Sequence, residues 1–186
     1  MASGFEELEV VAPLDILRRG GVEAVTASVE ETLELTGRNG ILLKADVYFT
    51  SVAADAFDLA VVPGGLGCVE TLMGKLEVLA FLSRNADRPW GTASICAGPL
   101  VLQKAGLIQN THLTSHPTVR EKLMESTANY IEQPVVDDGT ILTSRGAGTA
   151  VEFGFALLRK LEGDALMQAV QSQICWTGSR KTASNI

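Results

Sequence analysis

The chain has 186 residues, of which 46% are hydrophobic, 20% are charged and 5% are aromatic. Its formal net charge is −7, which argues against a nucleic-acid partner, because phosphate binding depends on clustered Lys and Arg. The sequence has neither an apolar run of the roughly 18–20 residues that a membrane span needs nor a basic segment followed by an apolar one at its start. We therefore expect a cytoplasmic protein with no membrane partner.

Predicted strands and helices alternate along the chain. Short runs rich in β-branched residues predict strands, and turns at 37–40 and 138–139 join two pairs of them as β-hairpins. The predicted strands cover residues 22–29, 33–36, 41–43, 59–62, 91–95, 112–114, 135–136 and 140–143. One predicted helix begins after a turn at 4–7. The other predicted helices cover 69–82, 98–104, 117–124, 149–161 and 164–174. Thr149 and Glu152 have the spacing of a capping box at the start of the helix 149–161.

This alternation predicts an α/β fold built from βαβ units around a mostly parallel sheet. The length fits one domain over residues 1–176, and residues 177–186 lack apolar periodicity, so we expect a disordered tail there. Sheets of this kind bind ligands at the carboxyl ends of their strands. Two candidate sites follow predicted strands in this way, namely Pro63-Gly64-Gly65 and Cys96.

Cys96 is the candidate nucleophile. It lies in SICAGP (94–99), where a predicted strand ends and a helix begins at once, which is typical of a nucleophile elbow. The start of the helix is expected to lower the pKa of the thiol, and free N–H groups of the turn could bind an oxyanion. The alternative is a buried, inert cysteine. With Cys68 and Cys175, the three cysteines form neither a disulfide framework nor a metal-ligand cluster, so we expect reduced thiols and no metal.

A glycine-rich turn follows the predicted strand 59–62. Its sequence, PGGLG (63–67), lets the backbone approach a ligand closely and offers free N–H donors. It could supply half of an oxyanion hole facing Cys96, and the alternative is an ordinary tight turn. It is not a P-loop, because no Gly-Lys-Ser/Thr follows.

Glu9 and His116 are the candidate acid–base groups. Glu9 lies in an apolar stretch, where a carboxyl needs a partner or a raised pKa, and it could stay protonated beside Cys96. Glu6 and Glu7 are explained as acids that stabilise the dipole of a helix start. His116 precedes a proline in a predicted loop and could shuttle protons for the thiol; the alternative is a solvated histidine.

Six segments together resemble the ThiJ/PfpI superfamily, specifically the branch that contains the parkinsonism-associated protein deglycase and its bacterial and plant relatives. The matching segments are GFEELE (4–9), DILRRGG (15–21), VPGG (62–65), ICAGP (95–99), TSHP (114–117) and LTSRGAGT (142–149). The resemblance extends in family order from residue 4 to about residue 175. It implies a flavodoxin-like three-layer sandwich and a homodimer.

The resemblance also implies roles for individual residues. Cys96 would be the nucleophile, easily oxidised to a sulfinate, and Glu9 would be the protonated carboxyl bonded to it. The backbone N–H groups of Gly65 and Ala97 would form the oxyanion hole, and His116 would be the proton shuttle.

Three arginines are further candidates. Arg145 lies between a predicted strand and a predicted helix and could hold an anion or a subunit contact; the alternative is a surface arginine. Arg19 and Arg38 are equally ambiguous by sequence alone. The resemblance implies that they meet near the site across the dimer interface.

For the activity, the resemblance implies a cysteine-dependent glyoxalase or deglycase that needs no cofactor. Methylglyoxal, glyoxal or their early glycation adducts would become hydroxy acids, which protects against carbonyl and oxidative stress. Ala97 stands where the protease-like branch has His, so we expect no peptidase activity. Two alternatives stay open: a redox-sensing or chaperone-like dimer that signals through oxidation of Cys96, and a binding domain in which Cys96 is inert.

The start of the sequence departs from the implied fold. Residues 4–7 look like a strand-to-helix turn, yet only three residues precede them. The strand that should feed this turn would be central in the implied sheet, and its loss would leave backbone groups unpaired at about 1–3 kcal/mol each. We therefore expect the first strand to be missing here, and our hypothesis is that Met1 lies inside that strand and that the natural start is upstream.

Overall fold

The computed structural model describes residues 1–54, 57–126 and 128–178, so most of the predicted tail at 177–186 lies outside the described residues. Its strands are β1 (Ala27–Ser28), β2 (Glu34–Thr36), β3 (Leu42–Lys44), β4 (Val47–Tyr48), β5 (Ala60–Val62), β6 (Thr92–Ile95), β7 (His112–Leu113), β8 (Asn129–Tyr130), β9 (Val135–Asp137) and β10 (Ile141–Ser144). Its helices are α1 (Glu7–Arg19), α2 (Phe49–Val52), α3 (Leu66–Met73), α4 (Leu76–Asn85), α5 (Pro99–Lys104), α6 (Arg120–Leu123), α7 (Ala150–Glu162) and α8 (Asp164–Gln173), with 3-10 turns η1 (Pro117–Val119) and η2 (Ala147–Thr149).

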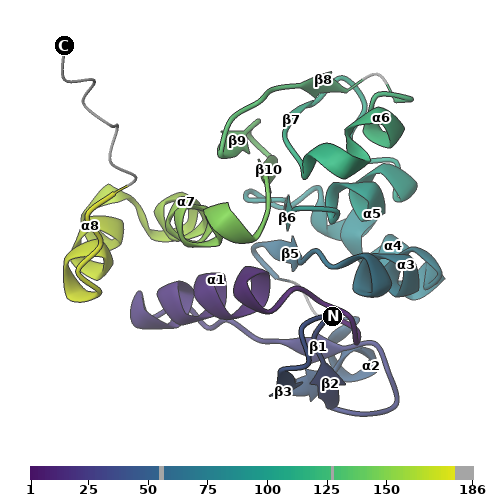
Figure 1. Ribbon diagram of the computed structural model, residues 1–186, viewed down its shortest axis with the longest axis horizontal. Helices are drawn as coiled ribbons and strands as arrows, with labels where there is room; N and C mark the ends of the chain where they lie inside the picture. Colours follow the sequence, from purple (N-terminus) through teal and green to yellow (C-terminus); the bar gives the residue numbers. More distant parts are fainter. Residues whose placement is uncertain (55–56, 127, 179–186) are drawn as a thin grey trace.

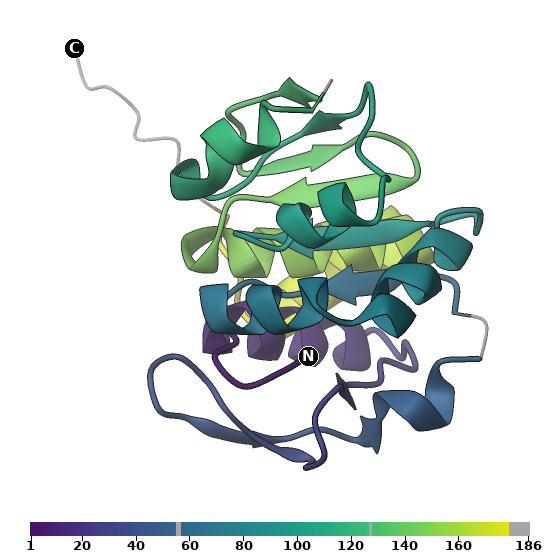
Figure 2. The same cartoon turned by 90° about the vertical axis from the view of Figure 1, so that its right-hand side faces the viewer.

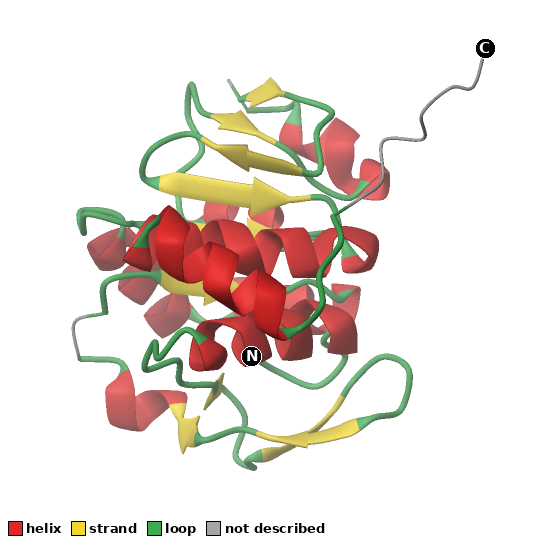
Figure 3. Ribbon diagram, turned by 90° about the vertical axis from the view of Figure 1, so that its left-hand side faces the viewer, coloured by secondary structure: helices red, strands yellow, loops and turns green. Residues whose placement is uncertain are grey.

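The central sheet has the strand order β5-β6-β10-β9. β5, β6 and β10 run parallel, and β9 pairs antiparallel with β10 as one of the two predicted hairpins; β2 and β3 form the other. Every residue of β6 and of β10 is buried, as expected for strands covered by helices on both faces. α1, α7 and α8 cover one face, and α3, α4 and α5 cover the other (Figures 1, 2 and 3). The predicted flavodoxin-like α/β fold is confirmed.

Three predicted elements differ in extent. The strand predicted at 22–29 is reduced to β1, because side chains hold the residues before it as a loop: Arg18 donates two hydrogen bonds to the Ala24 carbonyl, and the Asp46 carboxylate accepts one from the Thr26 N–H. The helix predicted at 69–82 is two helices, α3 and α4, which separate at Gly74, a residue that favours ending a helix. The helix predicted at 117–124 begins as the 3-10 turn η1 before α6.

The predicted capping box at Thr149 is wrong. Thr149 is the residue before α7, but its side chain makes no capping hydrogen bond. Its hydroxyl instead donates to the Gly146 carbonyl at 2.9 Å and lies 2.7 Å from the Ser144 hydroxyl. Thr149 therefore fixes the loop that follows β10 rather than the first turn of α7.

Close packing between α1 and α7 fixes the position of α1 on the sheet. Gly154 of α7 faces α1, and a methyl group there would lie 2.8 Å from Ile16 Cδ1 and 3.0 Å from Pro13 Cα. Glycine at this position lets the two helices approach closely, and Ile16 and Leu17 are buried beside α7. The amino end of α1, which carries Glu9, is thereby held at the carboxyl ends of β5 and β6.

The first residue lies beside β1. The Met1 amino group donates to the Ala27 carbonyl, and the Val29 N–H donates to the Met1 carbonyl at 3.0 Å, which is the pattern of a parallel bridge to Ser28. β1 and β4 form a two-stranded sheet separate from the central sheet. Among the described residues, no strand lies between β1 and β5, as expected from the short segment before residue 4.

None of the helices in the described parts of the chain has both the length and the apolar character that crossing a membrane requires.

Candidate active site

Cys96 occupies the turn between β6 and α5. Its φ is +64°, a left-handed conformation that costs a non-glycine residue about 1–2 kcal/mol. Two backbone hydrogen bonds hold this conformation: the Cys96 N–H donates to the Ser144 carbonyl at 3.0 Å, and the Cys96 carbonyl accepts from the His116 N–H at 2.9 Å. β10 and the loop before η1 thus fix the thiol at the carboxyl ends of the sheet, on the strand-to-helix turn that the sequence predicts.

Glu9 lies against Cys96. Its side chain is 2% exposed, its carboxyl group is hydrogen-bonded to the thiol, and its Oε2 accepts the Gly64 N–H at 2.9 Å. A methyl group on Gly64 would lie 2.3 Å from Glu9 Oε2 and 2.6 Å from Cys96 Cβ. Only glycine fits at this position, because its backbone contacts both reactive groups.

Backbone N–H groups surround the sulfur. Both Gly65 and Ala97, the two predicted oxyanion-hole donors, direct their N–H groups to the Cys96 thiol. Gly65 has a φ of +91°, and a methyl group there would lie 2.2 Å from the Gly4 carbonyl oxygen. The glycine turn therefore has a conformation that a side chain would prevent, and its donors point at the position where negative charge develops.

The pKa of Glu9 is raised to about 7, chiefly because the carboxyl is buried. The pKa of Cys96 is raised to about 12, first by burial and then by the negative charge of Glu9; the Ala97 and Gly65 N–H groups oppose this rise. The prediction that the elbow lowers the pKa of Cys96 is therefore wrong. Burial and an adjacent carboxylate outweigh the short helix α5 and the two N–H groups.

These values describe a pair that shares protons. Because Glu9 and the Cys96 thiol are in contact, they titrate as a pair, and once the pair has lost one proton, the other can be carried by the oxygen or by the sulfur. When this proton is on Glu9, the sulfur is a thiolate that accepts hydrogen bonds from the carboxyl and from two backbone N–H groups. The pair can thus supply both a nucleophile and an adjacent acid.

His116 lies beside the same cavity. Its Nδ1 accepts the Thr118 N–H at 3.3 Å and lies 2.8 Å from the Thr118 hydroxyl, so this network assigns the proton of the neutral ring to Nε2. A methyl group on Gly146 would lie 3.4 Å from His116 Cδ2 and 3.9 Å from Cys96 Sγ. Gly146 therefore leaves open the space that His116 and Cys96 share.

The open space is a cavity of about 370 Å³. Glu6, Glu9, Arg38, Cys96, His116, Pro117, Arg145 and residues 146–149 line it. The volume lies within the range of small-molecule pockets, about 300–1,000 Å³. Acidic, basic and thiol groups therefore converge on a space for a small polar compound.

The three predicted arginines have different surroundings. Arg38 and Arg145 line the cavity, where they pair with Glu6 at 3.4 Å and with Glu132 at 3.0 Å. Arg19 is in the last turn of α1 and pairs with Asp15 at 2.7 Å, away from the lining residues. That Arg19 lies near the site across a dimer interface stays a prediction, because the structure describes one chain.

Glu6 and Gly146 are among the lining residues that the sequence analysis missed. Glu6 was assigned only to the helix dipole, but it lies three residues before Glu9, a spacing that brings side chains to neighbouring positions on a helix. That spacing was the signal that could have identified it. Gly146 had no such signal, because its role depends on the hydrogen bonds that Thr149 makes to the loop.

Within residues 1–54, 57–126 and 128–178, no group of three His, Cys, Asp or Glu side chains could hold a metal ion.

A strained cysteine on a strand-to-helix turn, beside a buried glutamate in a flavodoxin-like sheet, defines a class of α/β proteins with a cysteine site. Within that class, the chain belongs to the DJ-1/PfpI family, whose family model matches residues 1–160. It is 34% identical over 171 residues to protein dj-1beta of Drosophila melanogaster, covering 91% of both chains. The crystal structure of that protein superposes with a TM-score of 0.89, covering 94% of both chains at 33% identity.

Two other relatives bear on function. The chain is 32% identical over 171 residues to a Caenorhabditis elegans protein named glutathione-independent glyoxalase DJR-1.2, covering 91% of this chain and 90% of that protein. A structure named Toxoplasma gondii DJ-1, oxidized, matches with a TM-score of 0.89 and 30% identity, covering 95% of both chains.

Proposed function

We propose that the protein is a cofactor-free glyoxalase that converts methylglyoxal or glyoxal into lactate or glycolate at Cys96. One observation carries this proposal: the free Cys96 thiol and the buried, protonatable Glu9 meet beside a cavity of about 370 Å³. A glyoxalase needs a nucleophile for the aldehyde and a base for the carbon next to it, and this pair can supply both. The relative from C. elegans that carries a glyoxalase name supports the same reaction.

The reaction begins with the thiolate form of Cys96. The sulfur attacks the aldehyde carbon, a C–S bond forms, and the π electrons of the carbonyl move to oxygen. The N–H groups of Gly65 and Ala97 stabilise this oxyanion, and Glu9 then gives it a proton. The product of this step is a hemithioacetal, and Glu9 is left as a carboxylate next to it.

The second step moves hydrogen between the two carbons of the substrate. Glu9 takes the proton from the former aldehyde carbon, and His116 Nε2–H protonates the neighbouring carbonyl oxygen. The enediol then accepts the proton from Glu9 at its second carbon, while the first oxygen returns its proton to His116. The first carbon is oxidised to a thioester and the second is reduced to an alcohol, so the exchange needs no external electron acceptor.

Water completes the cycle. As it attacks the thioester carbon it gives one proton to the Glu9 carboxylate, the C–S bond breaks, and the thiolate leaves with its negative charge held by the same N–H groups. The net reaction adds one water to the dicarbonyl and releases the hydroxy acid. We include early glycation adducts of the same aldehydes as further substrates, because they carry the same two carbons.

Replacement of Cys96 tests the proposal. Lactate formed from methylglyoxal should fall by about 10³-fold or more in Cys96→Ser, the order of loss typical when a nucleophile is removed. Cys175→Ser is the matched control, since Cys175 is an exposed free thiol remote from the cavity lining, and its turnover should equal that of the unmodified chain. Unchanged lactate formation in Cys96→Ser refutes the proposal.

A redox sensor is the second candidate function. The free thiol of Cys96 lies under two backbone N–H donors that could equally bind the oxygens of a sulfinate, and one structural relative is named as oxidized. Peroxide treatment followed by intact mass measurement tests it. A gain of two oxygens at Cys96 in a protein without methylglyoxal turnover would favour this function over the glyoxalase.

We also propose a homodimer. Leu8 and Val11 of α1 and Ile41 and Leu42 of the adjacent β2–β3 hairpin are large apolar side chains that are exposed in the single chain. Glu7 joins the two elements by accepting the Asn39 N–H at 2.7 Å, which holds the hairpin against the start of α1. Light scattering should give twice the mass of one chain, and Leu8→Glu should reduce it to that of one chain.

A further inference from the structure

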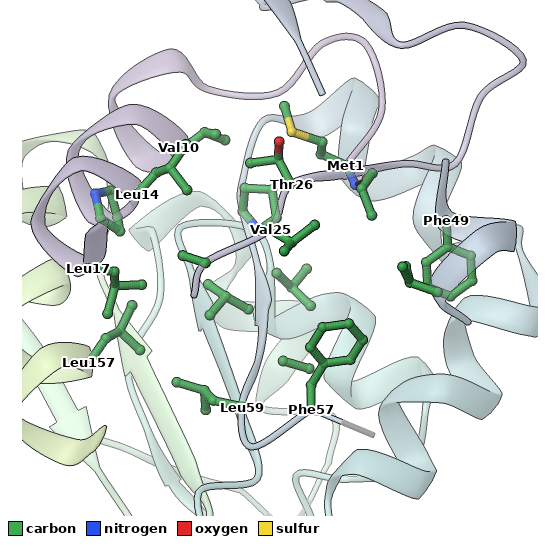
Figure 4. Close-up of a pocket in the computed structure, with 18 of the residues that line it drawn as sticks. Met1, Val10, Leu14, Leu17, Val25, Thr26, Phe49, Phe57, Leu59 and Leu157 are labelled. Carbon is green, nitrogen blue, oxygen red and sulfur yellow. Dashed lines mark hydrogen bonds between the residues drawn. The ribbon is translucent and has the colours of Figure 1, made fainter. Parts of the chain in front are cut away.

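The two acid–base groups of the site are held from opposite ends of the molecule. β7, β8 and α6 lie together at one end, and α1 and the β2–β3 hairpin lie at the other (Figures 1 and 2). On the side of Glu9, a cavity of about 520 Å³ has mostly apolar walls, which include Leu17 and Phe57 (Figure 4). Among the described residues, Glu9 alone lines both this cavity and the cavity at Cys96. The polar contacts that hold His116 come instead from the region of β7 and β8.

One peptide group connects His116 to the strained cysteine turn. It is the peptide between Ser115 and His116, and its N–H donates to the Cys96 carbonyl at 2.9 Å. Its carbonyl, which belongs to the buried Ser115, accepts the Tyr130 hydroxyl at 2.9 Å. Hydrogen bonds that follow one another in a chain polarise each other, so each of these two bonds strengthens the other. Tyr130 thus acts on the backbone of Cys96 through a single peptide group.

Contacts outside the site hold Tyr130 itself. It lies in β8 opposite Leu113 of β7, and the next N–H along the strand, that of Ile131, donates to the Leu113 carbonyl at 2.8 Å. The guanidinium of Arg120 lies 4.7 Å from the centre of the Tyr130 ring, a cation–π contact that holds the ring in place. Tyr130 and Arg120 do not line the cavity at Cys96. The hydroxyl is therefore directed at the Ser115 carbonyl by groups that do not contact a substrate in that cavity.

We propose that Tyr130 is a positioning residue, whose hydroxyl fixes the Ser115–His116 peptide and through it both the His116 ring and the turn at Cys96. Its effect on catalysis rests on the proposed glyoxalase function, whereas its effect on the loop rests on geometry alone. Thr118 holds the ring at Nδ1, but Thr118 belongs to the same loop and moves with it. A displacement of about 1 Å at a reacting group is enough to slow a reaction severely.

Amide hydrogen exchange in the full chain tests the effect on the loop. Tyr130→Phe removes the hydroxyl and keeps the ring beside Arg120. Exchange at the His116 N–H, followed by nuclear magnetic resonance, should become about tenfold faster, because the Ser115 carbonyl is left without its donor and the loop opens more readily. Exchange at the Ile131 N–H should stay within about twofold, because the pairing of β7 with β8 does not use the hydroxyl. A general loss of structure in β8 would instead speed both amides alike.

Turnover of methylglyoxal separates positioning from substrate binding. In Tyr130→Phe, kcat should fall by about tenfold while KM changes by less than about twofold, because the hydroxyl does not contact the substrate. Tyr48→Phe is the matched control: Tyr48 is the other tyrosine of the chain, exposed in β4 and outside the cavity lining, so its exchange and kinetics should equal those of the unmodified chain. Arg120→Gln, which removes the charge beside the ring and keeps the hydroxyl, should give a smaller increase of exchange at His116.

Three results would overturn the proposal. They are unchanged exchange at His116 in Tyr130→Phe, an equal increase at His116 and Ile131, and a kcat equal to that of an unmodified chain that does form lactate. If the unmodified chain forms no lactate, the glyoxalase proposal fails by itself. The exchange measurement then still decides whether Tyr130 positions His116 and Cys96, because it does not depend on turnover.

Discussion

Replacement of Glu9 by Gln removes the charge of the buried carboxyl with little change of shape. The Gln side-chain oxygen can still accept the Gly64 N–H, which now reaches Glu9 Oε2 at 2.9 Å. The Gln amide can donate to the Cys96 sulfur, as a protonated Glu9 would. The variant therefore isolates the free energy of holding a negative charge at this position.

The pKa of Glu9 gives the size of that free energy. The pKa of Glu9 rises from 4.5 to about 7 in the folded chain, mainly because the carboxyl is buried. At about 1.4 kcal/mol per pH unit, this difference corresponds to roughly 3 kcal/mol. Because the folded state binds the proton more tightly than the unfolded state, the unfolding free energy falls as the pH rises from 4.5 to about 7. This contribution is fully present below that range and lost above it.

Denaturant and thermal unfolding at about pH 4.5 and about pH 8 measure the effect. Glu9→Gln should be more stable than the unmodified chain by roughly 3 kcal/mol at the higher pH, or about 6–12 °C in melting temperature. The difference should vanish at the lower pH. Parallel stability curves for the two proteins across this range would refute the reasoning.

Glu7→Gln is a control of opposite sign. Burial raises the pKa of Glu7, but hydrogen bonds from its own N–H, from Asn39 and from Ile41 lower it further, so the pKa is below its ordinary value. Glu7 therefore stabilises the fold when it is charged. Glu7→Gln should lower stability at neutral pH, and the loss should shrink as the pH falls through the pKa of Glu7. A variant as stable as the unmodified chain at neutral pH would contradict this.

Three further predictions concern the site. Turnover of methylglyoxal should rise with pH with a midpoint near 7, because the Glu9–Cys96 pair must lose a proton before a thiolate exists, and a flat profile would contradict this. In Glu9→Gln, the pKa of Cys96 should fall from about 12, because the negative charge of the adjacent carboxylate is gone. Ultraviolet titration of the thiolate measures this pKa. A pKa of Cys96 that is higher in the variant would contradict the pairing of the two groups. Gly146→Ala should fold but lose about tenfold in turnover, because its methyl group lies 3.4 Å from His116 Cδ2, while Gly74→Ala, whose added methyl lies 3.5 Å from the Thr71 carbonyl oxygen and away from the cavity, should keep its activity.

Local signals in the sequence predict much of the fold. Asp138-Gly139 and the segment 37–40 locate both hairpins, and the short apolar runs locate β5, β6 and β10. These features depend on neighbouring residues in the chain. The break between α3 and α4 at Gly74 was also a local signal, but the apolar pattern on both sides obscured it.

The features that the sequence could not give depend on tertiary neighbours. The raised pKa of Cys96 follows from burial and from Glu9, which lies 87 positions earlier in the sequence. The reduction of the predicted strand 22–29 to β1 follows from hydrogen bonds to Arg18 and Asp46. The pairing of Arg38 with Glu6 at the cavity likewise requires that the β2–β3 hairpin fold against α1. Residue spacing within one segment cannot predict these contacts, because they join segments that are distant in the sequence.

The central claim is that Glu9 and Cys96 share protons at one site. Nuclear magnetic resonance of the protein with a carbon-13 label in its glutamate carboxyl groups, with Glu9→Gln to assign the Glu9 signal, measures this most directly. The account predicts that this signal titrates near pH 7 and that its midpoint shifts in Cys96→Ser. A Glu9 signal that titrates near 4.5, unaffected by the loss of the thiol, would contradict it.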